Sequence, residues 1–233
     1  MKVDQNIIEG LKQQNVVTLG FSMGKDSLAC ALLLKDLGVD FIPVYFYCIP
    51  GMGFINKKIE MYENYFNKKI VQLPHPMLWD MLRHQDFQTP EGIEYYSQIK
   101  FPKLTFEDLT ATYLEDIGVD TDIYDVVGMR AAESFNRRMI FKNKYPNGIN
   151  YKKKKIYPIF NWKNDDVWKY LKEKKAPIPD DYKIWGRSFD NFHYQFLMDV
   201  KKLYPEDYEI IKSYFPLIDL EIFKYVKNHE YLG

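Results

Sequence analysis

The sequence predicts an α/β protein in which helices flank a parallel, doubly wound sheet and a helical tail follows. Two apolar runs indicate the sheet: residues 16–20 are rich in β-branched side chains, and residues 39–48 are almost continuously apolar, as in strands buried on both faces. A helical pattern lies between them, which completes a βαβ unit with an expected right-handed crossover. The loop after the first run should therefore lie at the carboxyl edge of the sheet, where such folds bind ligands.

The remaining elements follow from periodicity and from helix start and stop signals. Gly38 ends the helix of the βαβ unit, and Pro205 opens a helix in the tail. Residues 85–104 fit neither period and are expected to form an exposed excursion near the site. We expect strands over 70–73, 124–130 and 156–160, and helices over 5–14, 54–68, 77–83, 105–117, 131–145, 161–171 with Asn164 as N-cap, 191–203, 205–214 and 217–228.

Composition limits the classes of protein that need to be considered. The 233 residues are 46% hydrophobic, enough for a substantial core, and 32 Lys and Arg balance 32 Asp and Glu, so only local patches can indicate a nucleic acid partner. Two cysteines, Cys30 and Cys48, cannot assemble a structural zinc site or a cysteine-held iron–sulfur cluster. Neither a signal peptide nor a membrane span is evident, so a cytoplasmic protein without membrane contact is expected.

Residues 22–27, Ser-Met-Gly-Lys-Asp-Ser, are predicted to form a phosphate-binding turn between the first strand and its helix. The N–H groups at a helix N-terminus attract anions, Gly24 permits close approach, Lys25 adds charge, and the two serines add hydroxyl donors. Because Asp26 follows the lysine, this is not a Walker A loop. Asp26 indicates either bound Mg²⁺ or a role at the helix start. The structural alternative is a capped helix in which Gly24 serves only the turn.

The pattern Ser-x-Gly-x-Asp-Ser at residues 22–27 resembles the PP-loop of the ATP pyrophosphatases, in the adenine nucleotide α-hydrolase group with its Rossmann-like HUP fold. Such proteins bind ATP and cleave it between the α and β phosphates. The resemblance implies an adenine-nucleotide-binding domain over residues 1–175 and a helical extension over 176–233 packed on it. It also implies nucleotide contacts from Phe21, Ser22, Gly24, Lys25, Asp26, Ser27, Gly128 and Arg130.

Residues 128–138, Gly-x-Arg-x-x-Glu-Ser-x-x-Arg-Arg, resemble the second signature of the phosphoadenosine phosphosulfate (PAPS) reductase branch. Arg130 stands at a strand end on the phosphate side, where a guanidinium can reach phosphate. Glu133, Arg137 and Arg138 are candidate substrate-binding residues, although charged residues on an exposed helix often only face solvent. The pattern at residues 158–168, a Pro-Ile pair, a Trp and then Asp-Val-Trp, resembles the third signature of the same family.

Two polar clusters lie outside these signatures. Residues 152–155 are four consecutive lysines, which form either a solvated hairpin or a contact with nucleic acid or polyphosphate. In the tail, Arg187, Asp190 and His193 are further candidates for substrate binding, with capping and ion pairing as the alternative.

The sequence also departs from the family pattern. A PAPS reductase uses a cysteine in its C-terminal segment, and residues 225–233 contain none, so thiol-based reduction is not expected. Residues 47–51, Tyr-Cys-Ile-Pro-Gly, replace the usual acid and Thr-Gly, so the acceptor pocket should differ. The pattern as a whole looks most like the short PAPS-reductase-like proteins of bacteriophages.

The resemblance implies an enzyme that adenylates an unidentified acceptor from ATP with Mg²⁺, using Lys25, Asp26 and Arg130 as catalytic residues. Alternatives are a non-catalytic module that binds an adenine nucleotide or PAPS, and a reductase-like protein that uses another cysteine. The sequence leaves open whether nucleic acid is a partner and whether the chain forms a homodimer.

Overall fold

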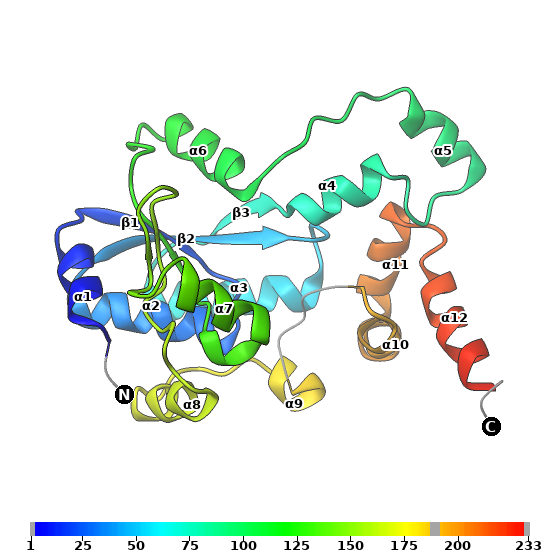
Figure 1. Cartoon of the computed structure of the whole chain (residues 1–233). Helices are drawn as coiled ribbons and strands as arrows, with labels where there is room; N and C mark the ends of the chain where they lie inside the picture. The colour runs from blue at the N-terminus through cyan, green and yellow to red at the C-terminus, as the bar shows by residue number, and fades with distance from the viewer. Residues whose placement is uncertain (1–2, 187–191, 231–233) are drawn as a thin grey trace. The chain divides into compact units, whose positions relative to one another are not determined.

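The computed structural model describes residues 3–186 and 192–230, which contain a six-stranded sheet (Figure 1). The spatial order of the strands is β3-β2-β1-β4-β6-β5. Strand β1 pairs in parallel with β2 and β4, and β4 pairs in parallel with β6, whereas β5 is antiparallel to β6. The predicted α/β fold with a mostly parallel, Rossmann-like sheet is confirmed. The strands are β1 (Val16–Gly20), β2 (Asp40–Tyr47), β3 (Val71–Pro74), β4 (Asp125–Val127), β5 (Ile149–Asn150) and β6 (Lys155–Ile156).

The register of the central strands places two loops next to each other. Gly20, the last residue of β1, lies opposite Val127, the last residue of β4. Because the strands are parallel, the chain leaves both of them at the same edge of the sheet. The segments that begin at Phe21 and Gly128 are therefore neighbours, so the signature at residues 22–27 lies beside the start of the signature at residues 128–138.

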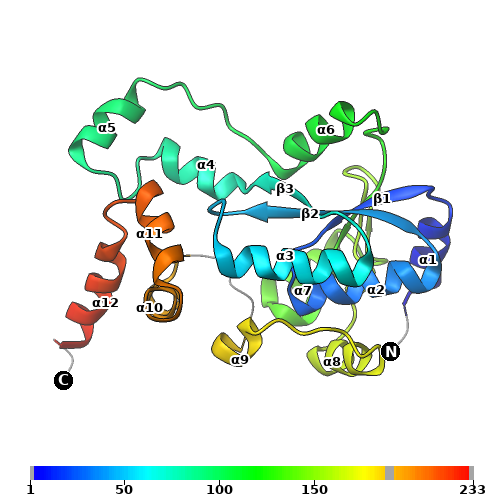
Figure 2. The same ribbon diagram turned by 180° about the vertical axis from the view of Figure 1, so that it is seen from behind.

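Helix α2 (Lys25–Leu37) is buried along most of its length because it packs on the sheet and on α8 (Asn164–Glu173). Residues 27–34 of α2 are all buried, and α2 and α8 lie side by side in both views (Figures 1 and 2). Tyr170 Oη of α8 donates to Asp36 Oδ2 at 2.7 Å. The helix ends at Gly38, whose backbone is left-handed (φ +69°), as predicted.

The chain folds as two compact units: one comprises Met1–Phe46, Tyr62–Gln72 and Ala111–Ser188, and the other comprises Tyr47–Met61, Leu73–Thr110 and Phe189–Gly233. The first contains α2 and both loops at the edge of the sheet. The other helices are α1 (Gln5–Lys12), α3 (Gly53–Phe66), α4 (Pro76–Arg83), α5 (Pro90–Ser97), α6 (Phe106–Asp116), α7 (Phe135–Asn143), α9 (Asp181–Trp185), α10 (Tyr194–Leu203), α11 (Pro205–Tyr214) and α12 (Asp219–Glu230), with a 3₁₀ turn η1 (Ala131–Glu133).

The second unit has its own aromatic and polar core. Phe54 stacks on Tyr204 with ring centroids 5.0 Å apart, and the buried carboxylate of Asp207 accepts from the backbone N–H groups of Gly53 and Phe54. Pro205 opens α11 with acids in its first turn, as predicted. Asp207 is thus a buried carboxylate that is held by two backbone donors.

Several expected boundaries were wrong. Residues 131–145 do not form one helix, because Ser134 is extended and its Oγ accepts from Arg137 N at 3.1 Å, which starts α7 afresh. The N-cap of α8 is Lys163 and not Asn164, since Asp166 accepts from Lys163 N. Residues 85–104 contain the regular helix α5, which Thr89 caps. The strands expected over 124–130 and 156–160 are limited to β4 and the end of β6.

Candidate functional site

The turn between β1 and α2 opens toward the edge of the sheet without a side-chain cap. Gly24 is the N-cap of α2, with extended backbone and no side-chain hydrogen bond, and Met23 before it is left-handed (φ +60°). Phe21 N donates to Val44 O at 2.8 Å, which ties the start of the turn to β2. The first N–H groups of an α-helix have no partner within the helix, so this end of α2 is suited to bind an anion.

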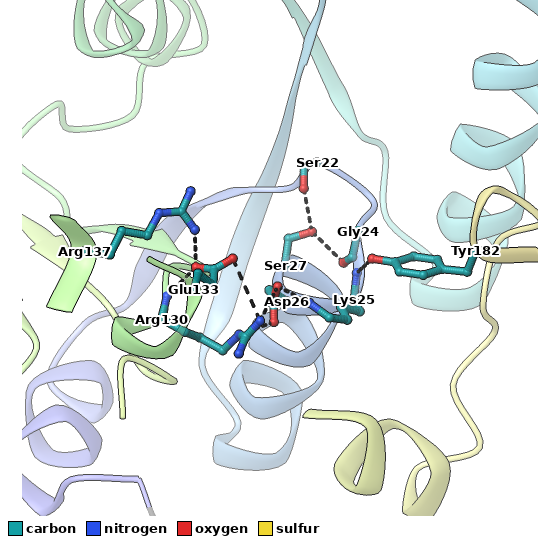
Figure 3. Close-up of polar contacts among 9 residues, drawn as sticks. All are labelled: Ser22, Gly24, Lys25, Asp26, Ser27, Arg130, Glu133, Arg137 and Tyr182. Atoms are coloured by element: carbon teal, nitrogen blue, oxygen red, sulfur yellow. Dashed lines mark hydrogen bonds and ion pairs between the residues drawn. The ribbon is translucent and has the colours of Figure 1, made fainter. Parts of the chain in front are cut away.

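Two serine hydroxyls hold the turn together. Ser27 Oγ donates to Gly24 O at 3.0 Å and lies 3.2 Å from Ser22 Oγ (Figure 3). Ser27 is buried, whereas Ser22 is exposed. The structure thus brings together the serines and the glycine that the sequence singles out. Their contact with a nucleotide stays a prediction.

A chain of alternating charges links the two loops (Figure 3). Lys25 Nζ lies 2.6 Å from Asp26 Oδ2, and Arg130 Nε donates to Asp26 Oδ1 at 2.6 Å. Glu133 Oε2 accepts from Arg130 N at 2.8 Å, and Glu133 also pairs with Arg137. Arg130 is only 4% exposed, so its guanidinium is held between two carboxylates. We call these five residues the charge chain.

Gly128 allows the loop after β4 to touch α2. A Cβ atom at this position would lie 2.8 Å from the carbonyl carbon of Asp26 and 2.9 Å from Ser27 N, which is closer than real Cβ atoms approach backbone. Sequence reasoning assigned Gly128 to nucleotide binding and missed this packing role. A glycine immediately after a buried strand was the available signal.

Tyr182 is a member of the site that sequence reasoning missed. Its hydroxyl accepts from Lys25 N at 2.8 Å, and its ring packs edge-on against Trp168 with centroids 5.2 Å apart. Tyr182 belongs to the short helix α9 and lies 157 residues from Lys25 in the sequence. No local pattern could have indicated such a contact.

Other predicted residues lie apart from the charge chain. The side chain of Phe21 is buried, with its ring edge-on to Tyr62 and Phe66 at 5.2 and 5.9 Å, so it serves the core. Arg138 is exposed on α7, and His193 precedes α10 in the second unit. Arg187 and Asp190 lie outside the described residues.

Neither cysteine is placed to act as a nucleophile. Cys30 is fully buried on α2, and burial, together with the negative charge of Asp26, raises the pKa of its thiol far above the usual range. Cys48 is 7% exposed, and both cysteines are free of disulfides. Because a thiolate is the attacking species in thiol chemistry, the burial of Cys30 argues against its use in reduction.

The donor set does not fit a metal ion held by protein ligands alone. Among residues 3–186 and 192–230, no group of three or more His, Cys, Asp and Glu side chains is arranged to bind a metal. Both carboxylate oxygens of Asp26 are already bonded to cations, one to Lys25 and one to Arg130. A magnesium ion on Asp26, considered from the sequence, therefore finds little support in these contacts.

Residues 3–186 and 192–230 contain no helix with the length and apolar character that a membrane crossing requires.

Comparison with known proteins identifies the family to which the chain belongs. The profile of the phosphoadenosine phosphosulfate reductase domain matches residues 16–183, which include β1, the turn, the charge chain and Tyr182. The chain belongs to this family. Proteins of this family bind nucleotides.

Two curated proteins that are similar in sequence are longer than this chain. The uncharacterized protein MJ0066 of Methanocaldococcus jannaschii is 31% identical over 201 residues, 80% of this chain and 36% of that protein. The uncharacterized protein MJ0973 of the same organism is 25% identical over 221 residues, 88% of this chain and 49% of that protein. The chain thus spans between about a third and half of the length of these relatives.

Two solved structures are also similar. The PAPS reductase from Candida auris in its phosphate complex is 12% identical, with 78% of this chain and 93% of that chain covered and a TM-score of 0.43. The NH3-dependent NAD synthetase from Campylobacter jejuni in complex with a nitrate ion is 13% identical, with 94% of this chain and 95% of that chain covered and a TM-score of 0.43.

Proposed function

We propose that this protein is an enzyme of the ATP pyrophosphatase type, which binds ATP at the turn of residues 22–27 and transfers AMP to an acceptor. The observation that carries the proposal is the charge chain, which joins Lys25 at the start of α2 to the buried Arg130 after β4 through Asp26. A helix N-terminus with a fixed lysine is suited to hold the pyrophosphate part of ATP.

The residues divide into binding and positioning groups. Lys25 and the open N–H groups of the first turn of α2 hold phosphate oxygens, and the hydroxyl of Ser22 adds a donor. Asp26 and Arg130 position Lys25, because Arg130 fixes the carboxylate that in turn fixes the ammonium group. The contact of Arg130 with phosphate, which the sequence suggested, remains part of the proposal. A phosphate oxygen at Lys25 N would replace the hydroxyl of Tyr182.

The reaction is an in-line displacement at the α-phosphorus of ATP. An oxygen of the acceptor forms a bond to the α-phosphorus, the bond from that phosphorus to the bridging oxygen breaks, and pyrophosphate leaves with the bonding electrons. The acceptor gives up its proton to water. Such chemistry depends on positioning and on charge neutralisation more than on acid–base groups. Mg²⁺ would enter with the phosphates of ATP and neutralise part of their charge.

The test is incubation of the purified protein with Mg²⁺ and ATP labelled at the α-phosphate, with and without cell extract. The proposal predicts label in AMP or on a new species, together with free pyrophosphate. Lys25→Ala should abolish the label transfer, whereas Lys12→Ala, an exposed lysine on α1, should leave it unchanged.

Two other outcomes would contradict the proposal. If ATP binds but stays intact with every extract, the chain is a non-catalytic nucleotide-binding module. If PAPS binds and ATP does not, the physiological nucleotide is a sulfonucleotide. Titration calorimetry with ATP, AMP and PAPS separates these two results, and Lys25→Ala again tells specific binding from weak association with the surface.

A further inference from the structure

One segment of the chain is strongly basic although the whole chain is balanced. Residues 135–155 contain eight of the 32 Lys and Arg residues and none of the 32 Asp and Glu residues, so the rest of the chain carries a formal charge of −8. The segment comprises α7 and the hairpin of β5 and β6. Its cations are Arg137, Arg138, Lys142, Lys144, Lys152, Lys153, Lys154 and Lys155.

Aromatic packing joins α7 and the hairpin into one structural element. The ring of Phe141 on α7 meets Tyr157, just after β6, edge-on at 5.3 Å, and Tyr145 stacks on Tyr157 at 6.0 Å. Phe141 and Tyr157 are buried. The cations of α7 and those of the hairpin are therefore carried on a common support, and they do not depend on a mobile tail.

Part of this charge is already used inside the protein. Arg137 pairs with Glu133, Lys154 with Asp122 and Lys155 with Asp125. Among the described residues, no ion pair involves Arg138, Lys142, Lys144 or Lys152, and all four are exposed. Four cations without acidic partners, close together in the chain, produce a positive local potential.

Aromatic side chains stand among these cations. Phe135 is 70% exposed at the start of α7, and Tyr151 at the tip of the hairpin is 62% exposed. Phe135, Arg138 and Lys142 are spaced i, i+3 and i+7, so they share one face of the helix. Exposed aromatic rings beside cations can stack on bases while the cations bind phosphates.

We propose that the exposed face of α7 formed by Phe135, Arg138 and Lys142 binds single-stranded nucleic acid. Arg138 and Lys142 contact the phosphate backbone, and Phe135 stacks on an unpaired base. A merely solvated basic face would not need a large apolar ring in water, and the exposed ring of Phe135 favours a strand with accessible bases over an acidic protein.

The position of this surface connects it to the nucleotide site. Helix α7 starts two residues after Glu133, one of the two acidic members of the charge chain that contact Arg130. A strand bound on α7 would lie beside the ATP-binding turn, and we infer that it supplies the acceptor for AMP. Binding of the strand stands by itself, whereas its role as acceptor rests on the proposed function.

The test uses the whole chain and labelled oligonucleotides of DNA and RNA, with fluorescence anisotropy measured over a range of salt concentrations. The double variant Arg138→Gln/Lys142→Gln should lower the slope of log affinity against log salt by about 1.4, which corresponds to two lost contacts with phosphates of a single strand. The matched control Lys169→Gln/Lys172→Gln, with the same change of charge on exposed positions of α8, should leave the slope unchanged.

Phe135→Ala tests the stacking contact. It should weaken oligonucleotide binding between about 5-fold and 150-fold, the range that corresponds to the loss of stacking of one base on one ring. Equal effects of the two double variants, or no effect of Phe135→Ala, would overturn the proposal. So would binding to vesicles that contain anionic lipid when the oligonucleotides do not bind.

The role as acceptor has a separate readout. Label from α-labelled ATP should appear on a bound oligonucleotide, and the double variant Arg138→Gln/Lys142→Gln should reduce this transfer. If the oligonucleotides bind but AMP and pyrophosphate form without labelling them, the proposed ATP cleavage stands and the acceptor role fails. If no AMP forms at all while binding persists, the binding surface stands and the proposed function fails.

Discussion

The loops that follow β1 and β4 leave the sheet at the same edge but are stabilised in different ways. Residues 22–27 are organised mainly by one another, through the hydrogen bonds of Ser22, Gly24 and Ser27. The loop after β4 has its strongest contact with Asp26, 104 residues earlier in the chain. The first loop is thus a local structure, whereas the second takes its form from the helix on which it packs.

This difference explains why the two signatures carry different amounts of information. The serine contacts that hold the first turn together lie within six residues, so the turn can be recognised from residues that are adjacent in the sequence. The role of Arg130 depends on a carboxylate that is distant in the sequence. The arginine side chain by itself predicts a contact with a negative charge, but it does not predict which residue supplies that charge. The predictions that follow test this contrast, from the largest expected effect to the smallest.

Arg130→Met should produce the largest loss of stability. It removes one of the two cations that pair with the carboxylate of Asp26 and leaves Lys25 as the other, and the expected decrease in the free energy of unfolding is about 3 kcal/mol. Urea unfolding followed by circular dichroism measures it. Arg138→Met, at an exposed position of α7, should change stability by less than about 0.5 kcal/mol.

A double-mutant cycle tests whether Asp26 is the relevant partner. Asp26→Asn should cost less in the Arg130→Met background than in the wild type. Additive losses would mean that the 2.6 Å contact between Arg130 Nε and Asp26 Oδ1 contributes nothing, and the contrast between the loops would fail.

Gly128→Ala should destabilise the protein by about 1–3 kcal/mol, because the new methyl group meets the backbone of Asp26 and Ser27. Chemical unfolding is again the measurement, and nucleotide affinity should fall with it. Gly10→Ala is the matched control: its Cβ would meet nothing within 4 Å, and the change lies inside α1. That variant should be as stable as the wild type or about 0.5–1 kcal/mol more stable. Equal midpoints for both variants would contradict the packing role.

Tyr182→Phe should lower the free energy of unfolding by about 1 kcal/mol, since it removes the hydroxyl that accepts from Lys25 N. Thermal unfolding without nucleotide is the measurement. Tyr95→Phe, at a ring that is 63% exposed, should have no measurable effect. A Tyr182→Phe protein with an unchanged midpoint would show that the turn after β1 needs no distant support, which would sharpen the contrast between the loops.

Ser134→Ala should have a similar or smaller effect, about 0.5–1 kcal/mol, because Ser134 Oγ caps α7 on the surface. Ser134→Asp keeps the cap and should restore most of the stability. Loss of stability in both variants would indicate that the hydroxyl is needed for something other than the cap.

The sequence alone determined the parts of this protein that depend on local patterns. The apolar runs predicted β1 and β2, Gly38 predicted the end of α2, and the spacing at residues 22–27 predicted the turn. These features follow from backbone preferences and from the periodic burial of side chains, which a stretch of chain specifies by itself.

Tertiary structure decided how the site is built. The contact of Arg130 with Asp26, the close approach at Gly128 and the contact of Tyr182 with Lys25 join residues more than 100 positions apart. Such contacts depend on the order of strands in the sheet and on the packing of α2, and a short motif contains neither. Sequence could therefore name the residues that carry charge, but only the fold could show which of them hold one another in place.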